Sequence, residues 1–158
     1  MECDQILANL YVGSHPHTCD DIHELHAAGI TAVLNLQSDE DCQHLAIDWS
    51  RLAARYFALG VAVHRVPIRD FDDDDLRNKL PEAVRALDEL LQEGRTVFVH
   101  CSAGVNRSPS AVICYLHWVR GLPLDEAESL VRRSHPCSPV MEVIRLATRD
   151  RKGRSRKA

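Results

Sequence analysis

The sequence predicts an α/β fold in which a central mixed, mostly parallel sheet of about five strands is flanked by helices. A strand, a helix and a second strand follow one another within residues 5–36, which is the βαβ order typical of parallel sheets. Later in the chain, a long amphipathic helix over residues 76–93 leads into the apolar run Thr96–Val99. The 158 residues, 45% of them apolar and 27% charged, match the size and composition of one globular domain.

The first half of the chain is predicted to supply four of these strands. Residues 5–13 read as two short strands around an Ala-Asn turn that end at Gly13. A helix follows, because Thr18 and Asp21 have the spacing of a capping box and Gly29 is the expected stop after an apolar stripe. The remaining elements are a strand over 31–36, a polar loop from 37, a helix over 50–59 that stops at Gly60, and a strand over 61–68.

The second half is predicted to contain the fifth strand and the longer helices. The carboxylate-rich loop 70–75 precedes the amphipathic helix 76–93, which ends at Gly94, and residues 96–99 are the central strand. We then expect a buried helix over 108–120, a helix over 124–133 and a helix over 139–149, with Ser138 as the cap of the last one and Pro139 in its first position. Residues 1–150 should form one domain and the basic residues 151–158 a disordered tail.

The segment His100-Cys101-Ser102-Ala103-Gly104-Val105-Asn106-Arg107-Ser108-Pro109 joins the central strand to the next helix. Unpaired N–H groups and the positive end of the helix dipole favour an anion such as phosphate at this kind of junction. In that field the Cys101 thiol should ionise readily and become a nucleophile, and the planar fork of Arg107 can hold two phosphate oxygens. Either residue alone would be read as an ordinary core cysteine or a solvated arginine; together they predict a reactive, phosphate-binding loop.

This segment resembles the His-Cys-x5-Arg loop of the protein tyrosine phosphatase superfamily, and Ser108 with the Ala-Gly pair fits its dual-specificity branch. The resemblance implies the cysteine phosphatase fold and hydrolysis of phosphomonoesters through a phosphocysteine, with Cys101 as nucleophile and Arg107 holding the phosphoryl oxygens. Ser108 would hydrogen-bond the departing thiolate, and His100 would orient the loop from beneath. The implied substrate-binding residues of the loop are Ser102, Ala103, Gly104, Val105 and Asn106. No metal or other cofactor is implied.

A cysteine phosphatase also needs a carboxylic acid, because phosphate leaves an alcohol slowly unless the departing oxygen is protonated. The loop 70–75 offers five carboxylates. In the family the general acid lies on a loop after a strand and upstream of the cysteine, so Asp70 is the best match, and Phe71 would flank the pocket. Asp72 to Asp75 are instead interpreted as acids that complement the dipole of the following helix.

Three further stretches resemble the plant glucan phosphatases, a dual-specificity subgroup: Asn9–Ser14, Arg69–Asp72 with Leu76-Arg77 and Leu80-Pro81, and Pro136–Pro139 with Ile144-Arg145 and Ala147-Thr148. The last of them resembles a C-terminal element that packs against the active site. The chain departs from that subgroup in its aromatic channel, since the matching positions are Cys3, His44, Leu45 and Ser138 and only Phe71 is left. It also has Asn106 where the subgroup usually has glycine.

Three hypotheses of function therefore stay open: a phosphatase that acts on phosphoproteins or another phosphomonoester, a phosphoglucan phosphatase, and a phosphate-binding module without turnover. The presence of cysteine, arginine and acid argues against the third.

Composition limits partners and location. A net charge of −4 gives no general attraction to nucleic acid, and no apolar run reaches the ~18 residues of a membrane helix. Six scattered cysteines without a C-x-x-C pair indicate the cytoplasm or another reducing compartment, and we expect a monomer. The histidines at 15, 17, 23 and 26 match no zinc spacing and are read as solvated.

Overall fold

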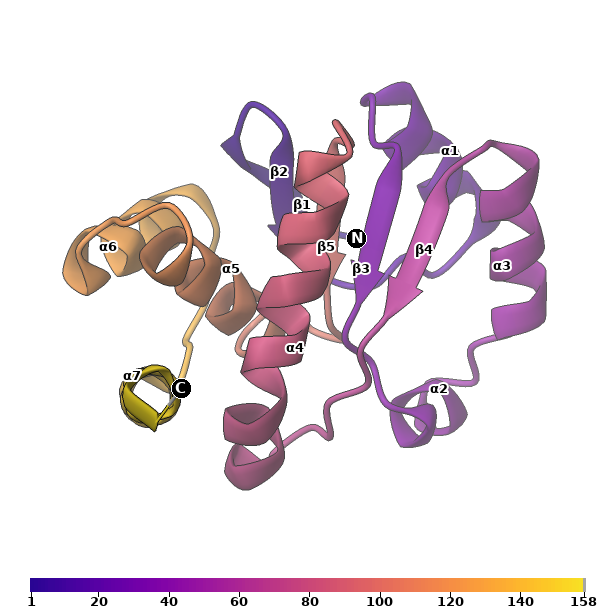
Figure 1. Ribbon diagram of the computed structural model, residues 1–158. Helices are drawn as coiled ribbons and strands as arrows, with labels where there is room; N and C mark the ends of the chain where they lie inside the picture. The colour runs from indigo at the N-terminus through magenta and orange to yellow at the C-terminus, as the bar shows by residue number, and fades with distance from the viewer. Residues whose placement is uncertain (158) are drawn as a thin grey trace.

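The computed structural model describes residues 1–157 and confirms an α/β fold built on a five-stranded sheet (Figure 1). The strands are β1 Cys3–Leu7, β2 Leu10–Gly13, β3 Ala32–Asn35, β4 Ala62–Arg65 and β5 Val97–His100. Their order across the sheet is β1-β2-β5-β3-β4, with β1 antiparallel to β2 and all other pairs parallel. The central position of β5 matches its fully buried, apolar sequence.

The helices cover both faces of this sheet (Figure 1). They are α1 Cys19–Ala27, α2 Asp39–His44, α3 Trp49–Ala58, α4 Asp73–Gln92, α5 Arg107–Trp118, α6 Leu124–Ser134 and α7 Met141–Lys157. Successive residues of β5 point to opposite faces: Val97 and Val99 pack in the core under α4 and α5, whereas Phe98 packs in a second core with residues of α1 and α3. In residues 1–157, no helix combines the length and the apolar character needed to cross a bilayer.

The register of the sheet brings four loops to one edge. Gly13 and Asn35 both lie opposite His100, and Arg65 lies opposite Asn35. The chain therefore leaves β2, β5, β3 and β4 at the same level, at the carboxyl ends of the parallel strands. Ligand sites of open α/β sheets form at this edge, and the Cys101–Asn106 loop lies in its middle.

Helix α2 is a departure from the predicted polar loop. Ser38 and Asp41 form a capping box, in which the Ser38 hydroxyl accepts from the Asp41 N–H and the Asp41 carboxylate accepts from the Ser38 N–H. The six residues of α2 are almost entirely polar and carry no apolar stripe, so hydrophobic periodicity gave no signal for a helix. Two other boundaries also differ: β4 is shorter than the predicted strand 61–68, and α4 begins at Asp73, before the predicted start.

The C-terminal helix also differs from the prediction at both ends. It begins at Met141, not at Pro139, and the N–H groups of Ser138 and Val140 before it donate to Val105 O and Asn106 Oδ1 of the central loop. It continues to Lys157, so the predicted disordered tail is wrong for residues 151–157, and residue 158 lies outside the described residues. An ion pair between Arg77 and Asp150 (2.7 Å) and the Arg151 guanidinium over the Trp118 ring (5.3 Å) hold the helix, and its Arg and Lys residues favour helix intrinsically.

Candidate active site

The loop after β5 packs tightly on the end of β2. Gly104 has φ +74°, and a Cβ atom there would lie 2.8 Å from the carbonyl carbon of Gly13. The N–H of His15 donates to Ser102 O (3.0 Å) from the neighbouring loop. Glycine at position 104 therefore serves both a left-handed backbone conformation and a close approach of two backbone segments.

His100 supports this loop from below, as the sequence predicts. Its ring is buried and stacks on Phe98, and Nδ1 lies 3.0 Å from Cys101 O, an acceptor, so Nδ1 carries the proton. Nε2 is buried without a hydrogen-bond partner. Burial lowers the pKa of His100 to about 4, so the ring is neutral near pH 7.

The N-terminus of α5 keeps its N–H groups free of a side-chain cap. Asn106 occupies the N-cap position but makes no capping hydrogen bond. Its Oδ1 accepts from Val140 N (2.9 Å) and Ser110 Oγ (3.2 Å) instead. The unpaired N–H groups and the positive end of the helix dipole are thus available to an anion in the loop.

Cys101 lies at this positive end with 2% of its surface exposed. Its Sγ is 3.3 Å from Ser108 Oγ, and Ser108 donates to Gly13 O (3.1 Å). Because a hydroxyl has a single proton, donation to Gly13 competes with donation to a Cys101 thiolate. Burial raises the pKa of four other thiols, which makes them poor nucleophiles: Cys3, Cys42, Cys114 and Cys137.

Arg107, the first residue of α5, is buried among acceptors. Its Nη1 donates to Asp41 Oδ2 (2.6 Å) and Ile68 O (2.8 Å), and its Nη2 lies 3.1 Å from Asp70 Oδ2. Its Nε is buried and has no partner. Helix α2, which follows β3, and the loop that follows β4 thus both contact the guanidinium of Arg107.

Asp70 and Phe71 form the turn after β4. Phe71 has φ +56° and 98% of its surface exposed, so its ring stands at the mouth of the site. A cavity of about 210 Å³ is lined by Asp70, Phe71, Cys101, Ala103, Val105, Asn106 and Arg107. The structure therefore brings most of the predicted site residues together, with Ser108 and Gly104 beneath them. Asp72 is the N-cap of α4 and accepts from Asp75 N, and Asp73, Asp74 and Asp75 lie in the first turn, near the positive end of the helix dipole.

A shallower groove continues from the cavity toward α2. It measures about 380 Å³, shares Asp70 and Phe71 with the cavity, and is also lined by Ser38, Glu40, Asp41, His44, Leu45 and Ser102. Ser102 accepts a hydrogen bond from Gln37 Nε2 (3.1 Å). Leu45, Phe71 and Val105 are exposed apolar side chains around the two hollows. The groove thus combines a few apolar side chains with carboxylates, and among the described residues that line it Phe71 is the only phenylalanine, tyrosine or tryptophan.

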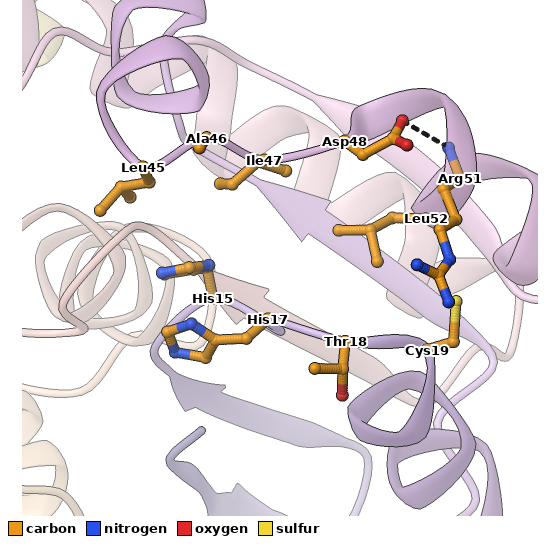
Figure 2. Close-up of a pocket in the computed structure, with 10 residues that line it drawn as sticks. All are labelled: His15, His17, Thr18, Cys19, Leu45, Ala46, Ile47, Asp48, Arg51 and Leu52. Carbon is orange, nitrogen blue, oxygen red and sulfur yellow. Dashed lines mark hydrogen bonds between the residues drawn. The ribbon is translucent and has the colours of Figure 1, made fainter.

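A separate cavity of about 270 Å³ lies between the loop after β2 and the segment that joins α2 to α3 (Figure 2). Figure 2 shows His15 and His17 on one wall and Leu45, Ile47 and Leu52 across from them. The two imidazole centroids are 4.0 Å apart, and burial together with His17 lowers the pKa of His15. His15 is therefore buried, in contrast to the solvated state expected for this histidine group. Within residues 1–157, no three His, Cys, Asp or Glu side chains gather as metal ligands would.

Two contributors to the site were not predicted from the sequence. Asp41 reaches Arg107 from α2, 66 positions earlier in the chain. His135 bridges the loop to β1, with Nε2 2.7 Å from Gly104 O and Nδ1 2.7 Å from Asp4 Oδ2. The Ser38-x-x-Asp41 spacing could have indicated α2, but not its arginine partner.

A buried cysteine and an arginine that line one cavity at the start of a helix are the residues expected of the cysteine-dependent phosphatases, a class of phosphoric monoester hydrolases. Residues 10–146 match the family model "Dual specificity phosphatase, catalytic domain". The chain belongs to this family.

Similar proteins include phosphoglucan phosphatases and dual specificity protein phosphatases. The chain is 39% identical to phosphoglucan phosphatase LSF1, chloroplastic, of Arabidopsis thaliana over 95% of its own length and 25% of the relative. It is 32% identical to laforin of Mus musculus (90% and 46%) and 33% identical to dual specificity protein phosphatase 5 of Rattus norvegicus (85% and 32%). The chain thus spans between a quarter and a half of these relatives.

Solved structures show the same fold. Tk-PTP in its active form superposes with a TM-score of 0.74 at 27% identity, with 94% of each chain covered. PTPMT1 superposes with a TM-score of 0.76 at 20% identity over 99% of this chain and all of the other. The predicted cysteine phosphatase fold is confirmed.

Proposed function

We propose that this chain hydrolyses phosphomonoesters through a phosphocysteine intermediate formed on Cys101. The observation that carries the proposal is the convergence of Cys101, Arg107 and Asp70 on one cavity at the N-terminus of α5. In the first step the Cys101 thiolate attacks phosphorus, and the loop N–H groups and Arg107 hold the equatorial oxygens. Asp70 gives its proton to the leaving oxygen, so the alcohol departs neutral.

In the second step water attacks the phosphocysteine. Asp70, now a carboxylate, takes a proton from this water, and the thiolate of Cys101 is the leaving group. Ser108 Oγ, 3.3 Å from Sγ, can rotate its proton from Gly13 O to the departing sulfur and stabilise its charge.

The Cys101→Ser variant tests the nucleophile. We expect turnover of p-nitrophenyl phosphate to be lost, because a hydroxyl ionises far less readily than a thiol, while phosphate and vanadate still bind to the intact N–H groups. Cys19→Ser, a half-buried cysteine of α1, is the matched control and should keep full activity. Turnover by Cys101→Ser above a tenth of the parent rate would refute the assignment.

For the substrate we propose a phosphoprotein or a small phosphomonoester, with phosphoglucan as the second candidate. The second candidate is supported by identity to phosphoglucan phosphatase LSF1 and by contacts of Ser138 and Val140 with the loop, where that subgroup is expected to pack a C-terminal element. The first is supported by the lining of the groove. Neutral sugars bind on flat aromatic faces, and here Leu45 and His44 lie beside a single phenylalanine.

Aromatic residues elsewhere do not extend this surface. Tyr56 is buried in the core, Trp49 lies under Arg65 (5.4 Å), and neither these two nor Phe57 lines a hollow next to Cys101. We further propose that the protein acts as a monomer in a reducing compartment such as the cytoplasm, without nucleic-acid or membrane partners. Its six cysteines are free and its net charge is −4, which supports this view.

A further inference from the structure

Two carboxylates contact the guanidinium of Arg107, and their settings differ. Asp41 approaches Nη1 at 2.6 Å with 11% of its side chain exposed. Asp70 approaches Nη2 at 3.1 Å with 33% of its side chain exposed. Proton transfer requires Asp70 to turn toward the leaving oxygen, whereas the buried Asp41 stays with the arginine.

Asp41 is fixed independently of Arg107. Its Oδ2 atom also accepts from Ser38 N (2.8 Å), a contact of the α2 capping box, and from Ser38 Oγ (3.0 Å). Burial disfavours the charged carboxylate, but the hydrogen bonds from Arg107 and Ser38 outweigh burial, and the pKa of Asp41 lies below its usual value. Asp41 is thus a stationary negative charge at neutral pH.

The contacts of Arg107 are unevenly distributed around its guanidinium. Nη1 has two acceptors, Asp41 Oδ2 and Ile68 O, whereas Nε has none. The N–H bonds of Nε and Nη2 run parallel along one edge of the guanidinium, and such an edge matches two oxygens of a phosphoryl group. The anchored corner thus lies opposite the edge suited to bidentate binding.

We propose that Asp41 is a positioning residue for the phosphatase reaction. Its carboxylate and the Ile68 carbonyl hold Nη1, and the Nε–Nη2 edge is thereby presented to the phosphoryl group. The proposal rests on the proposed function. Orientation of this edge matters most in the transition state, where charge on the equatorial oxygens is bound in line with attack by sulfur.

The chain contains a matched control. Asp21 of α1 occupies the same place in a capping box, since its Oδ2 accepts from Thr18 N (2.9 Å) and His17 N (2.7 Å). Within residues 1–157, no arginine forms an ion pair with Asp21, whereas Arg107 forms ion pairs with Asp41 and Asp70. Substitution of Asp21 therefore removes a helix cap without touching Arg107.

The experiment compares Asp41→Ala, Asp41→Asn, Ser38→Ala and Asp21→Ala with the parent protein. We measure kcat and KM for p-nitrophenyl phosphate, inhibition by vanadate, and Tm. We expect Asp41→Ala to lower kcat by ~10-fold to 100-fold and to raise the vanadate Ki by a similar factor, with KM changed less than ~3-fold, because misplaced groups cost transition-state binding. Asp41→Asn keeps an oxygen acceptor for Nη1 and should show ~3-fold to 10-fold effects.

A purely structural role predicts another pattern. If Asp41 only caps α2, then Ser38→Ala and Asp21→Ala variants with the same loss of Tm should change kcat and the vanadate Ki as much as Asp41→Ala does. That result overturns the proposal. Should Asp41→Ala fail to fold, parent-like kcat and vanadate Ki in Asp41→Asn overturn it equally. The proposed function fails separately, if the parent and Cys19→Ser proteins bind phosphate by calorimetry but release none from the ester.

Discussion

The buried His100 makes the stability of the fold depend on pH. The His100 ring is neutral in the folded core, where one of its nitrogens has no hydrogen-bond partner. In mild acid the ring takes up a proton when the protein unfolds, because its pKa is about 4 in the folded state and near 6.5 in the unfolded state. The unfolded state binds more protons in this window, so the stabilisation is fully present above pH 6.5 and is lost as the pH falls through 4. These two values give a loss of about 2 kcal/mol between pH 7.5 and pH 5.

The assay is urea unfolding of the parent, His100→Asn and His23→Asn proteins at pH 7.5 and pH 5. In His100→Asn the amide can still donate to Cys101 O, so the variant removes the titrating ring and keeps the loop contact. We expect the difference in unfolding free energy between the two pH values to shrink by about 2 kcal/mol in His100→Asn. It should stay unchanged in His23→Asn, an exposed residue of α1. The buried His15 is present in all three proteins and cancels. An equal pH difference in parent and His100→Asn would contradict the reasoning.

Three other predictions concern the catalytic loop and its substrate. Gly104→Ala should destabilise the fold by ~1–3 kcal/mol more than Gly121→Ala, by urea unfolding, because both residues have positive φ but only the Gly104 Cβ meets backbone within 3.0 Å; equal losses would contradict this. Asp70→Asn should lower kcat on an alkyl phosphate by ~10²-fold to 10⁴-fold and remove one limb of the pH profile. The same loss in Asp72→Asn or Asp73→Asn, and not in Asp70→Asn, would identify another acid. Specific activity on solubilised amylopectin should not exceed that on an aryl phosphate at matched phosphate concentration, and a large preference for amylopectin would favour the phosphoglucan alternative.

The sequence predicted the central loop well because its chemical requirements are local. Residues 97–118 contain in order a strand, a cysteine, a glycine, an arginine and a helix, and each of them predicts its own part of the loop without reference to the rest of the chain. Asp70 also follows a strand, so its position at the same edge of the sheet could be predicted, and it lines the cavity with Cys101. The five strands and most helices were predicted for the same reason, from periodicity and caps within single segments.

The missed features depend on contacts between distant segments. Thr18-x-x-Asp21 stands beside an apolar stripe and predicts a helix, whereas Ser38-x-x-Asp41 has the same spacing but opens a polar segment without such a stripe. The role of Asp41 depends on an arginine 66 positions away, which no local pattern contains. The continuation of α7 past residue 149 has no local sequence signal, since the contacts at Asp150 and Arg151 are made with Arg77 and Trp118 of other helices.

Contacts with segments distant in sequence hold the catalytic loop, and they have a consequence for synthesis of the protein on the ribosome. Gly104 is joined through His135 to Asp4, and Asn106 accepts from the N–H of Val140; these contacts form a clamp that reaches the loop from β1 and from the segment after α6. A nascent chain that has emerged only as far as α5 already contains Cys101, Arg107 and Asp70 but lacks this clamp. Contacts so distant in sequence form late. Until His135 and Val140 have left the exit tunnel the loop cannot make these contacts, so Cys101 lacks its final geometry during that interval.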